Sequence, residues 1–255
     1  MNRTDKVRKY RIGMRQILCM LAIAVLLDAG IAGSIPAAPR GTDQDNEVHL
    51  EKVHSLYWKA VLRHDVKKGK KVIAKRGSRV TVTYRRMHGK CRIEIGKKGK
   101  ASVPSSWLSF RKDLTTVEKE GDYNTATKEA FINRKTRVKK KEKYVIWVSL
   151  DKQRVNVFRA DSGKWKLHRV YKCSTGDVGS PTAPGWHRVD YKHEWVQGLH
   201  WFTEVIGGGM HKWPGRIKKS LYGKHVASHG CIRMSGKNAK ELYKMVKVRT
   251  RVLVY

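Results

Sequence analysis

Strand-like sequence patterns occupy two long parts of the chain, which restricts it to strand-rich folds. In residues 72–110, Val80, Val82 and Tyr84 alternate with polar residues, and a second run beginning at Cys91 does the same. Side chains two positions apart lie on one face of a strand, so each run predicts a half-buried strand. Four or five short strands separated by glycine turns predict a small barrel.

The strand pattern returns at residue 144 and continues almost to the end of the chain. Runs rich in valine, isoleucine and aromatic residues occupy residues 144–150, 154–159, 165–173 and 186–191, and residues 249–255 predict an edge strand. One helix is expected late in the chain, because Ser235 is a good N-cap and Ala239, Leu242, Tyr243 and Val246 share one helix face. The fold class predicted is therefore mainly β: a small barrel followed by a larger β-rich domain with one late helix.

Composition shifts divide the chain into five expected segments. Val53, Leu56 and Ala60 recur at helical spacing, which predicts a short helix behind an acidic linker, and a second short helix is expected at residues 125–131. The segments are a signal peptide or membrane anchor at 1–38, the linker and short helix at 39–65, the barrel at 66–112, a charged linker at 113–143 and the second domain at 144–255.

The N-terminus has the layout of a secretory signal. Six basic residues precede an apolar run at residues 17–27, and small residues follow it. Asp28 ends the run well short of the about 20 apolar residues that a full bilayer span needs. We therefore expect an exported protein at the cell wall or the outer face of the cytoplasmic membrane, with cleavage after Ala32 or retention as an anchor.

The net charge of the 255-residue chain is +35, and it is spread through both expected domains. Residues 56–143 contain 27 Lys/Arg against 8 Asp/Glu, and residues 144–255 contain 21 against 7. Such a surface concentrates polyanions. Because no recognition motif accompanies the charge and the chain is expected to be exported, nucleic acid is excluded as a partner. Anionic wall polymers and a membrane surface remain.

Outside the N-terminal apolar run the chain has three cysteines, Cys91, Cys173 and Cys231. The first two lie in strand-like runs, where a small buried side chain is expected. Cys231 lies in Ser-His-Gly-Cys-Ile-Arg-Met, two residues after His229, and His211 follows a glycine run upstream. Since a thiol nucleophile needs a neighbouring base or positive field, Cys231 is the candidate nucleophile, with His211 favoured over His229 as its base.

Other residues of the motif are candidates for supporting roles. Gly230 permits a tight turn, and the N–H groups of Gly230 and Cys231 are candidate oxyanion donors. Ser228 is expected to support the loop. Arg233 has three candidate roles: to hold a substrate carboxylate, to lower the thiol pKa, or to pair with an acidic side chain, of which the last is favoured. The histidines near Cys231 lack the compact spacing of zinc ligands, so neither a metal nor a cofactor is expected.

This motif, with an upstream histidine, closely resembles the signature of the L,D-transpeptidase (YkuD-like) catalytic domain. Residues 174–176 (Ser-Thr-Gly) and 181–185 (Pro-Thr-Ala-Pro-Gly) extend the resemblance, which covers about residues 144–255. It implies that His211 is the general base for Cys231 and that peptidoglycan stem peptides are the substrate. The implied reaction forms 3→3 cross-links through a cysteine thioester, without metal or cofactor. Lys212, Trp213 and Pro214 depart from the family's pattern after the upstream histidine.

Two other functions remain open. If water resolves the thioester, the protein is an L,D-carboxypeptidase that acts on stem tetrapeptides. If the barrel and the positive surface carry the function, it is a non-enzymatic wall-binding protein. Residues 75–82 and 103–108 resemble a bacterial SH3-like domain, although Lys90 and Cys91 stand where that family usually has tryptophan. This second resemblance implies either peptidoglycan binding or a spacer role.

Overall fold

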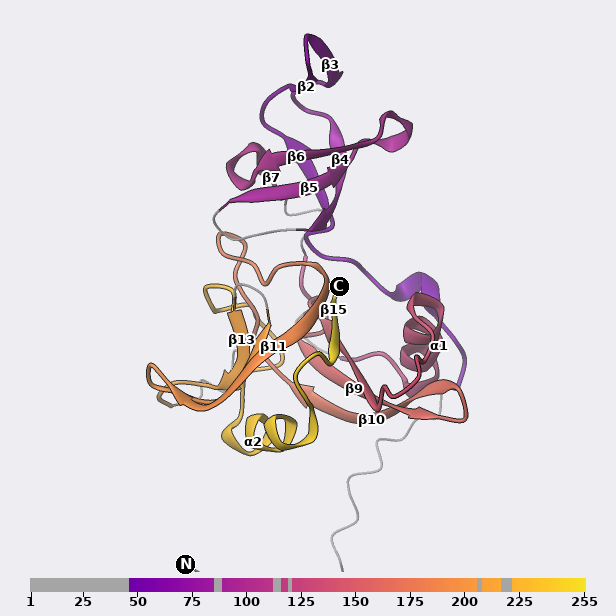
Figure 1. Ribbon diagram of the computed structural model, residues 1–255, viewed down its shortest axis with the longest axis vertical. Helices are drawn as coiled ribbons and strands as arrows, with labels where there is room; N and C mark the ends of the chain where they lie inside the picture. The colour runs from indigo at the N-terminus through magenta and orange to yellow at the C-terminus, as the bar shows by residue number, and fades with distance from the viewer. Residues whose placement is uncertain (1–45, 85–88, 112–115, 119–120, 206–207, 217–221) are drawn as a thin grey trace, which may run out of the picture. The chain divides into compact units, whose positions relative to one another are not determined.

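The computed structural model describes residues 46–84, 89–111, 116–118, 121–205, 208–216 and 222–255 (Figure 1). The expected signal peptide or anchor lies outside these residues. Within the described parts, no helix has the length and apolarity that a membrane span requires. The fold is mainly β with two α-helices among the described residues, and they lie where the sequence predicted a short helix at residues 125–131 and a late helix.

A small antiparallel sheet forms first, with the strand order β6-β5-β4-β1-β7. Its inward residues Val82, Cys91 and Ile93 are fully buried, which confirms the two-residue alternation predicted there. The strands are β1 (Lys59–Leu62), β4 (Arg79–Tyr84), β5 (Lys90–Glu94), β6 (Lys100–Pro104) and β7 (Leu108–Ser109), with a separate pair, β2 (Val66–Lys68) and β3 (Lys71–Ala74). Its identity as an SH3-like barrel stays a prediction.

The prediction of a short α-helix around residues 53–61 is wrong. The structure has a 3-10 turn at Leu50–Lys52, and strand β1 begins at Lys59. Tyr57 has a φ of 60°, which an α-helix does not allow. Leu56 and Tyr57 pack into the core of the larger domain, whereas Ala60 belongs to the core of the small sheet. The apolar spacing therefore serves two cores and not one helix face.

An eight-stranded sheet dominates the rest of the described chain, in the order β10-β9-β8-β15-β11-β12-β13-β14. Two pairs in it, β15 with β8 and β13 with β14, are parallel. The strands are β8 (Tyr144–Ser149), β9 (Arg154–Asp161), β10 (Lys164–Lys172), β11 (Gly185–Val196), β12 (Leu199–Val205), β13 (Gly208–Lys212), β14 (Ile232–Met234) and β15 (Arg251–Val254). The final strand is central rather than an edge, because β8 and β11 flank it and Val252, Leu253 and Val254 are all buried.

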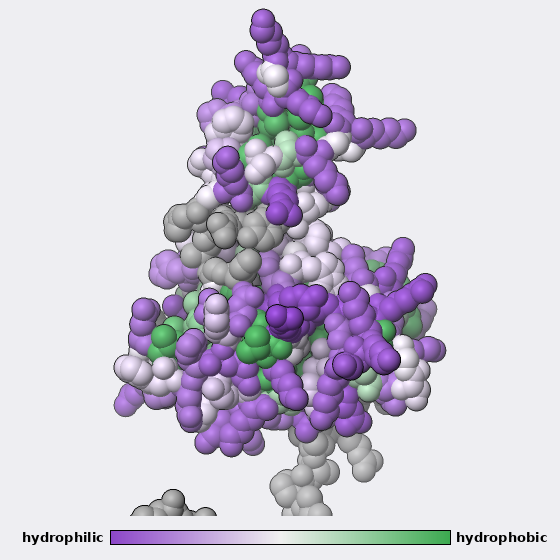
Figure 2. All heavy atoms as spheres, viewed as in Figure 1, coloured by the Kyte–Doolittle hydropathy of each residue, from purple (hydrophilic) through white to green (hydrophobic). Residues whose placement is uncertain are grey.

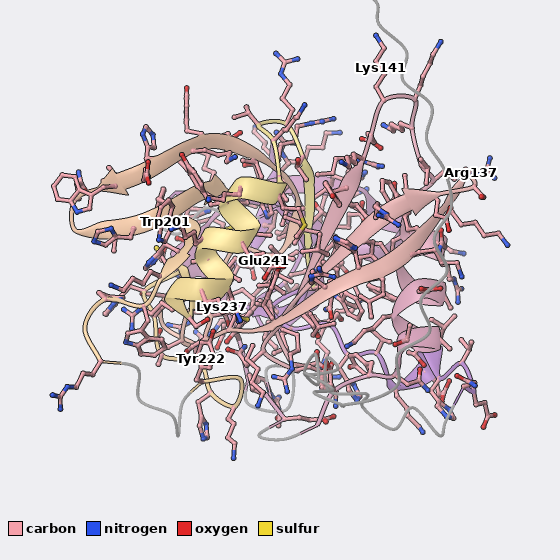
Figure 3. The ribbon with its side chains drawn as sticks, turned by 90° about the horizontal axis from the view of Figure 1, so that it is seen from below. Arg137, Lys141, Trp201, Tyr222, Lys237 and Glu241 are labelled. Atoms are coloured by element: carbon pink, nitrogen blue, oxygen red, sulfur yellow. The ribbon has the colours of Figure 1, made fainter. Side chains whose placement is uncertain are left out.

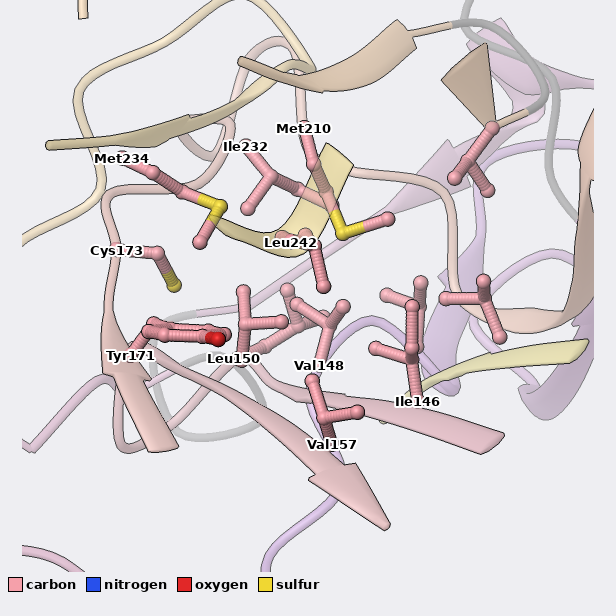
Figure 4. Close-up of a cluster of buried hydrophobic side chains, with 14 of the residues drawn as sticks. Ile146, Val148, Leu150, Val157, Tyr171, Cys173, Met210, Ile232, Met234 and Leu242 are labelled. Atoms are coloured by element: carbon pink, nitrogen blue, oxygen red, sulfur yellow. The ribbon is translucent and has the colours of Figure 1, made fainter. Parts of the chain in front are cut away.

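Helices cover the sheet at two places (Figure 1). Helix α2 (Gly236–Met245) packs on β12 and β13 and contributes Ala239 and Leu242 to the main core, which confirms the predicted apolar face (Figure 4). Helix α1 (Thr125–Lys135) packs on β10. Its Phe131 and Ile132 join Trp147 in a second core. The helix expected at residues 125–131 within the charged linker is therefore present and packed, and its buried Lys128 pairs with Asp122 at 2.6 Å.

The N-cap of α2 provides a test of the fold. The Ser235 side chain accepts a hydrogen bond from the Asn238 N–H at 3.2 Å. Ser235→Ala is expected to lower the free energy of unfolding by about 1 kcal/mol, because this N–H loses its acceptor. Urea unfolding checks it, with Ser235→Asp as the control that keeps an acceptor. Equal losses in the two variants would contradict the capping role.

Candidate active site

Cys231 immediately precedes β14, and His211 lies on β13. The parallel register of these strands pairs Met210 with Ile232 and His211 with Arg233. Met210 and Ile232 are buried in the main core (Figure 4). Because side chains alternate along a strand, His211 and Arg233 belong to the opposite face of the sheet. Cys231, two residues before Arg233, belongs to that face as well.

The His211 imidazole is buried and oriented by its own backbone. His211 is only 2% exposed, and its Nδ1 lies 2.6 Å from the carbonyl oxygen of Lys212. A carbonyl only accepts, so Nδ1 carries the proton in this contact. The neutral ring then has its lone pair on Nε2, the arrangement that a general base requires. Phe202 stacks against the ring, with centroids 5.8 Å apart.

Burial lowers the pKa of His211 below its usual value, and the positive charge of Arg233 lowers it further. The hydrogen bond to Lys212 acts in the opposite direction but does not overcome burial. The imidazole is therefore neutral at pH 7 and able to take a proton. Within the described residues, no hydrogen bond joins this imidazole to the Cys231 thiol, and catalytic contacts are often longer without substrate.

Thr182 connects the two loops that flank Cys231. Its hydroxyl accepts from the Gly176 N–H at 3.0 Å and donates to the Gly230 carbonyl at 2.8 Å. A Cβ added at Gly176 would lie 2.2 Å from the Ser180 carbonyl oxygen, so only glycine fits. The Ser-Thr-Gly and Pro-Thr-Ala-Pro-Gly segments therefore meet beneath the cysteine loop. The sequence placed Thr182 in a motif but did not reveal this bridge.

Ser228 stabilises the turn that leads into Cys231. Its hydroxyl donates to the Cys231 carbonyl and accepts from the Gly230 N–H at 3.2 Å. The Gly230 backbone has a φ of 115°, in the region that favours glycine. The Gly230 N–H is thus engaged within the loop, whereas the sequence made it a candidate oxyanion donor. His229 is exposed in the same turn.

Arg233 has a structural environment. One guanidinium nitrogen donates to the Ala227 carbonyl at 2.9 Å, and the group lies 5.0 Å from the centroid of the Trp213 ring. No ion pair of Arg233 with an acidic side chain occurs in the parts of the chain that the structure describes. The favoured structural role is therefore present, but a carbonyl and a tryptophan replace the expected acid.

The histidines and tryptophans of residues 191–205 lie on a hairpin formed by β11 and β12. Strands β11 and β12 pair through His193 with Phe202 and through Trp195 with His200. Trp201 contacts Tyr243 of α2 at 5.6 Å, and Figure 3 shows it beside that helix. Trp195 is 63% exposed. Phe202, the ring that backs His211, was missed because nothing in the sequence gives the register of this hairpin.

The other cysteines lie away from solvent. Cys91 and Cys173 are fully buried, and burial raises the pKa of the Cys173 thiol far above its usual range. Both match the expectation of small buried side chains. Cys231 is half-buried and is the one cysteine of the described residues that solvent reaches. In those residues, no group of three or more His, Cys, Asp or Glu is placed to hold a metal ion.

The comparison with protein families identifies this domain. The model of the L,D-transpeptidase catalytic domain, YkuD, matches residues 143–254. The chain therefore contains a YkuD-type L,D-transpeptidase catalytic domain, as the sequence resemblance predicted. A comparison with curated proteins gives no match.

Solved structures show more distant similarity. A Clostridium acetobutylicum protein, described as a fused Zn-dependent amidase/peptidase/peptidoglycan-binding domain-containing protein, is 26% identical over 60% of this chain and 75% of its own, with a TM-score of 0.43. An L,D-transpeptidase from Mycobacterium smegmatis is 18% identical over 66% of this chain and 67% of its own, with a TM-score of 0.39. An Enterococcus faecium L,D-transpeptidase is 23% identical over 45% of this chain and 50% of its own, with a TM-score of 0.37. The chain therefore spans half the length of that protein.

Thr182→Val tests the bridge beneath the cysteine loop. The substitution keeps the side-chain size but leaves the buried Gly176 N–H and Gly230 carbonyl without their partner. We expect a loss of about 1–3 kcal/mol in the free energy of unfolding, measured by urea denaturation. Thr182→Ser keeps the hydroxyl and should retain most of the stability. A Val variant as stable as the Ser variant would show that the bridge contributes nothing.

The protonation of His211 is measurable directly by NMR titration of its imidazole nitrogens. Its pKa should lie below the usual value of about 6.5, since burial disfavours the charged ring. Arg233→Gln removes the nearby positive charge and should raise this pKa. Arg233→Lys keeps the charge and should change it less. A His211 pKa at or above the usual value in the unsubstituted protein would contradict the neutral base.

Proposed function

We propose that the protein is an L,D-transpeptidase that forms 3→3 cross-links between peptidoglycan stem peptides. The observation that carries this proposal is the pairing of β13 with β14. It assigns a buried, neutral His211 and the half-buried Cys231 to one face of the sheet. A thiol that solvent reaches beside a base with a free lone pair is the arrangement that nucleophilic acyl transfer requires.

In the first step, His211 Nε2 takes the proton of the Cys231 thiol. The thiolate attacks the carbonyl carbon of the third stem residue, and the bond to the terminal D-Ala breaks. The proton on His211 passes to the departing D-Ala amine, and the third residue stays on Cys231 as a thioester. Because the Gly230 N–H is engaged by Ser228, we assign the oxyanion contact to the Cys231 N–H.

In the second step, an amine from a neighbouring stem attacks the thioester. His211 takes a proton from this amine, a new amide forms, and the Cys231 sulfur leaves as a thiolate that regains its proton. If water attacks instead, the product is a free tripeptide and the reaction is that of an L,D-carboxypeptidase. The nucleophile and base are common to both reactions, so the acceptor alone separates them.

The substrate implies a location outside the cytoplasm. We infer that the protein is exported and acts at the wall or on the outer face of the cytoplasmic membrane. The basic, apolar and small-residue layout of residues 1–38 supports this inference. The small N-terminal sheet then holds the enzyme to peptidoglycan or acts as a spacer.

Mass spectrometry of a purified tetrapeptide muropeptide incubated with the full-length protein tests the proposal. Wild type should form a dimer that has lost one D-Ala. Cys231→Ala and His211→Ala should reduce its formation by at least about a hundredfold, because they remove the nucleophile and the general base. Cys91→Ala, a cysteine substitution in the other core, is the matched control and should remain active.

Each product pattern has a different consequence. Formation of tripeptide without dimer would show that the protein is an L,D-carboxypeptidase that uses the same site, and not a transpeptidase. An active Cys231→Ala protein would overturn the assignment of the nucleophile. No product at all, together with tight binding to whole cell walls, would favour a non-enzymatic wall-binding protein.

A further inference from the structure

A cleft on the catalytic domain lies outside the site described above. It has a volume of about 550 Å³, and β11, β15 and the segment after α1 form its walls. This volume falls in the usual range of ligand sites. Its lining residues are Lys135, Thr136, Lys139, Trp186, His187, Arg188, Asp190 and Arg251.

Charge is concentrated in this cleft. Four cationic side chains line it against one carboxylate, that of Asp190. Lys135, Lys139 and Arg188 are exposed, and within the described residues none of the three forms an ion pair. Hydrophilic side chains cover much of the visible surface in Figure 2, so charge alone singles out no site. A hollow that gathers exposed cations without acidic partners is more specific, although Arg188 also donates to the Arg249 carbonyl and Lys135 lies over the Tyr255 ring.

Arg251 lies at the buried side of the cleft and is only 8% exposed. Its terminal nitrogens contact Thr136, the Arg137 carbonyl at 3.0 Å and Glu142 at 2.5 Å. Its Nε has no hydrogen-bond partner among the described residues. This nitrogen has almost no exposed surface, so a ligand in the cleft would meet the exposed cations around Arg251 and not its Nε.

Trp186 adds an apolar wall. Trp186 is 39% exposed, and the Arg251 guanidinium carbon lies 5.7 Å from the centroid of its ring. An exposed ring beside cations fits a ligand that alternates an anionic group with a carbon-rich unit. Phosphodiester groups linked by sugars or polyols have this alternation, and arginine and lysine bind phosphate well.

We propose that this cleft binds an anionic wall polymer built of polyol phosphate units. A phosphodiester enters the cleft to meet Lys135, Lys139 and Arg188, and the polyol packs on Trp186. A flat membrane surface or a DNA duplex does not enter a hollow of this size. The proposal rests on the wall location inferred for the function, but it does not depend on turnover.

The cleft also has a connection to the catalytic loop. His187 lines the cleft and, on its other side, a small cavity with Gly230 and Thr182. Its Nε2 lies 2.9 Å from the Ala183 carbonyl, in the segment that the Thr182 bridge holds. Independently of this contact, a polymer in the cleft would keep the domain on the wall, where stem peptides are concentrated.

Equilibrium binding of a fluorescent glycerol phosphate oligomer to full-length Cys231→Ala protein tests the proposal. The triple variant Lys135→Gln, Lys139→Gln, Arg188→Gln should bind about tenfold more weakly, because three exposed cations that contact phosphate are lost. The dependence of log affinity on log salt should become shallower by about two, because three phosphate contacts are lost. Trp186→Ala should weaken binding without a change in that slope.

The matched control removes three exposed charges elsewhere, with Lys237→Gln, Lys244→Gln and Lys247→Gln. Figure 3 shows Lys237 on α2, apart from Arg137 and Lys141 of the segment that borders the cleft. This control should bind within about twofold of the parent protein, because only general attraction is reduced. Equal losses in the two triple variants would overturn the cleft and leave a nonspecific charge effect.

Two further measurements complete the test. Binding to single-stranded DNA of equal charge, or to phosphatidylglycerol vesicles, with greater affinity and the same dependence on Trp186 would overturn the wall polymer as the ligand. Dimer formation from the soluble muropeptide should be unchanged when the cleft triple variant is made in the protein with Cys231 intact. If the cleft triple variant loses oligomer binding but still forms dimer, the polymer site and the proposed transpeptidase activity are shown to be independent.

Discussion

The parallel pairing of β13 with β14 is the constraint on which the site depends. It is held on the outer side by two backbone hydrogen bonds between Ser174 and Arg233, at 2.8 and 2.9 Å. On the inner side, Met210, Ile232 and Met234 fill the core beneath α2 (Figure 4). A one-residue shift of either strand would turn His211 or Cys231 into that core. The proposed catalytic chemistry therefore depends on packing that contains neither Cys231 nor His211.

Polar contacts complete this constraint. Buried Gln153 binds Thr175 through both ends of its amide, and Thr182 holds Gly176 to the Gly230 carbonyl. These partners are buried, so their loss leaves donors and acceptors unsatisfied rather than exposed to water. The cysteine loop is thus fixed in place by the fold, which would reduce the ordering that the proposed reaction requires.

The sequence predicted the parts that local patterns encode. Two-residue alternation located strands of the small sheet, and runs rich in valine, isoleucine and aromatic residues located strands of the larger one. The apolar face of α2 followed its spacing, and the motif around Cys231 identified the family. Long-range pairing was not predictable: Tyr57 belongs to a different core from Ala60, and the last strand lies between β8 and β11. Phe202 lies against His211 only because of hairpin register, which no local pattern specifies. The sequence predicted a positive charge spread over the whole surface, whereas the structure places four of the cationic side chains in one cleft beside Trp186.

Intact-protein mass spectrometry during turnover of a tetrapeptide muropeptide tests the central claim most directly. The account predicts a covalent adduct with the mass of the substrate less one D-Ala, located on Cys231 by peptide mapping. It should accumulate when the acceptor amine is acetylated, because the thioester then lacks its second substrate, and it should be absent in His211→Ala. Product formed without any adduct, or an adduct on another residue, would contradict the thioester mechanism.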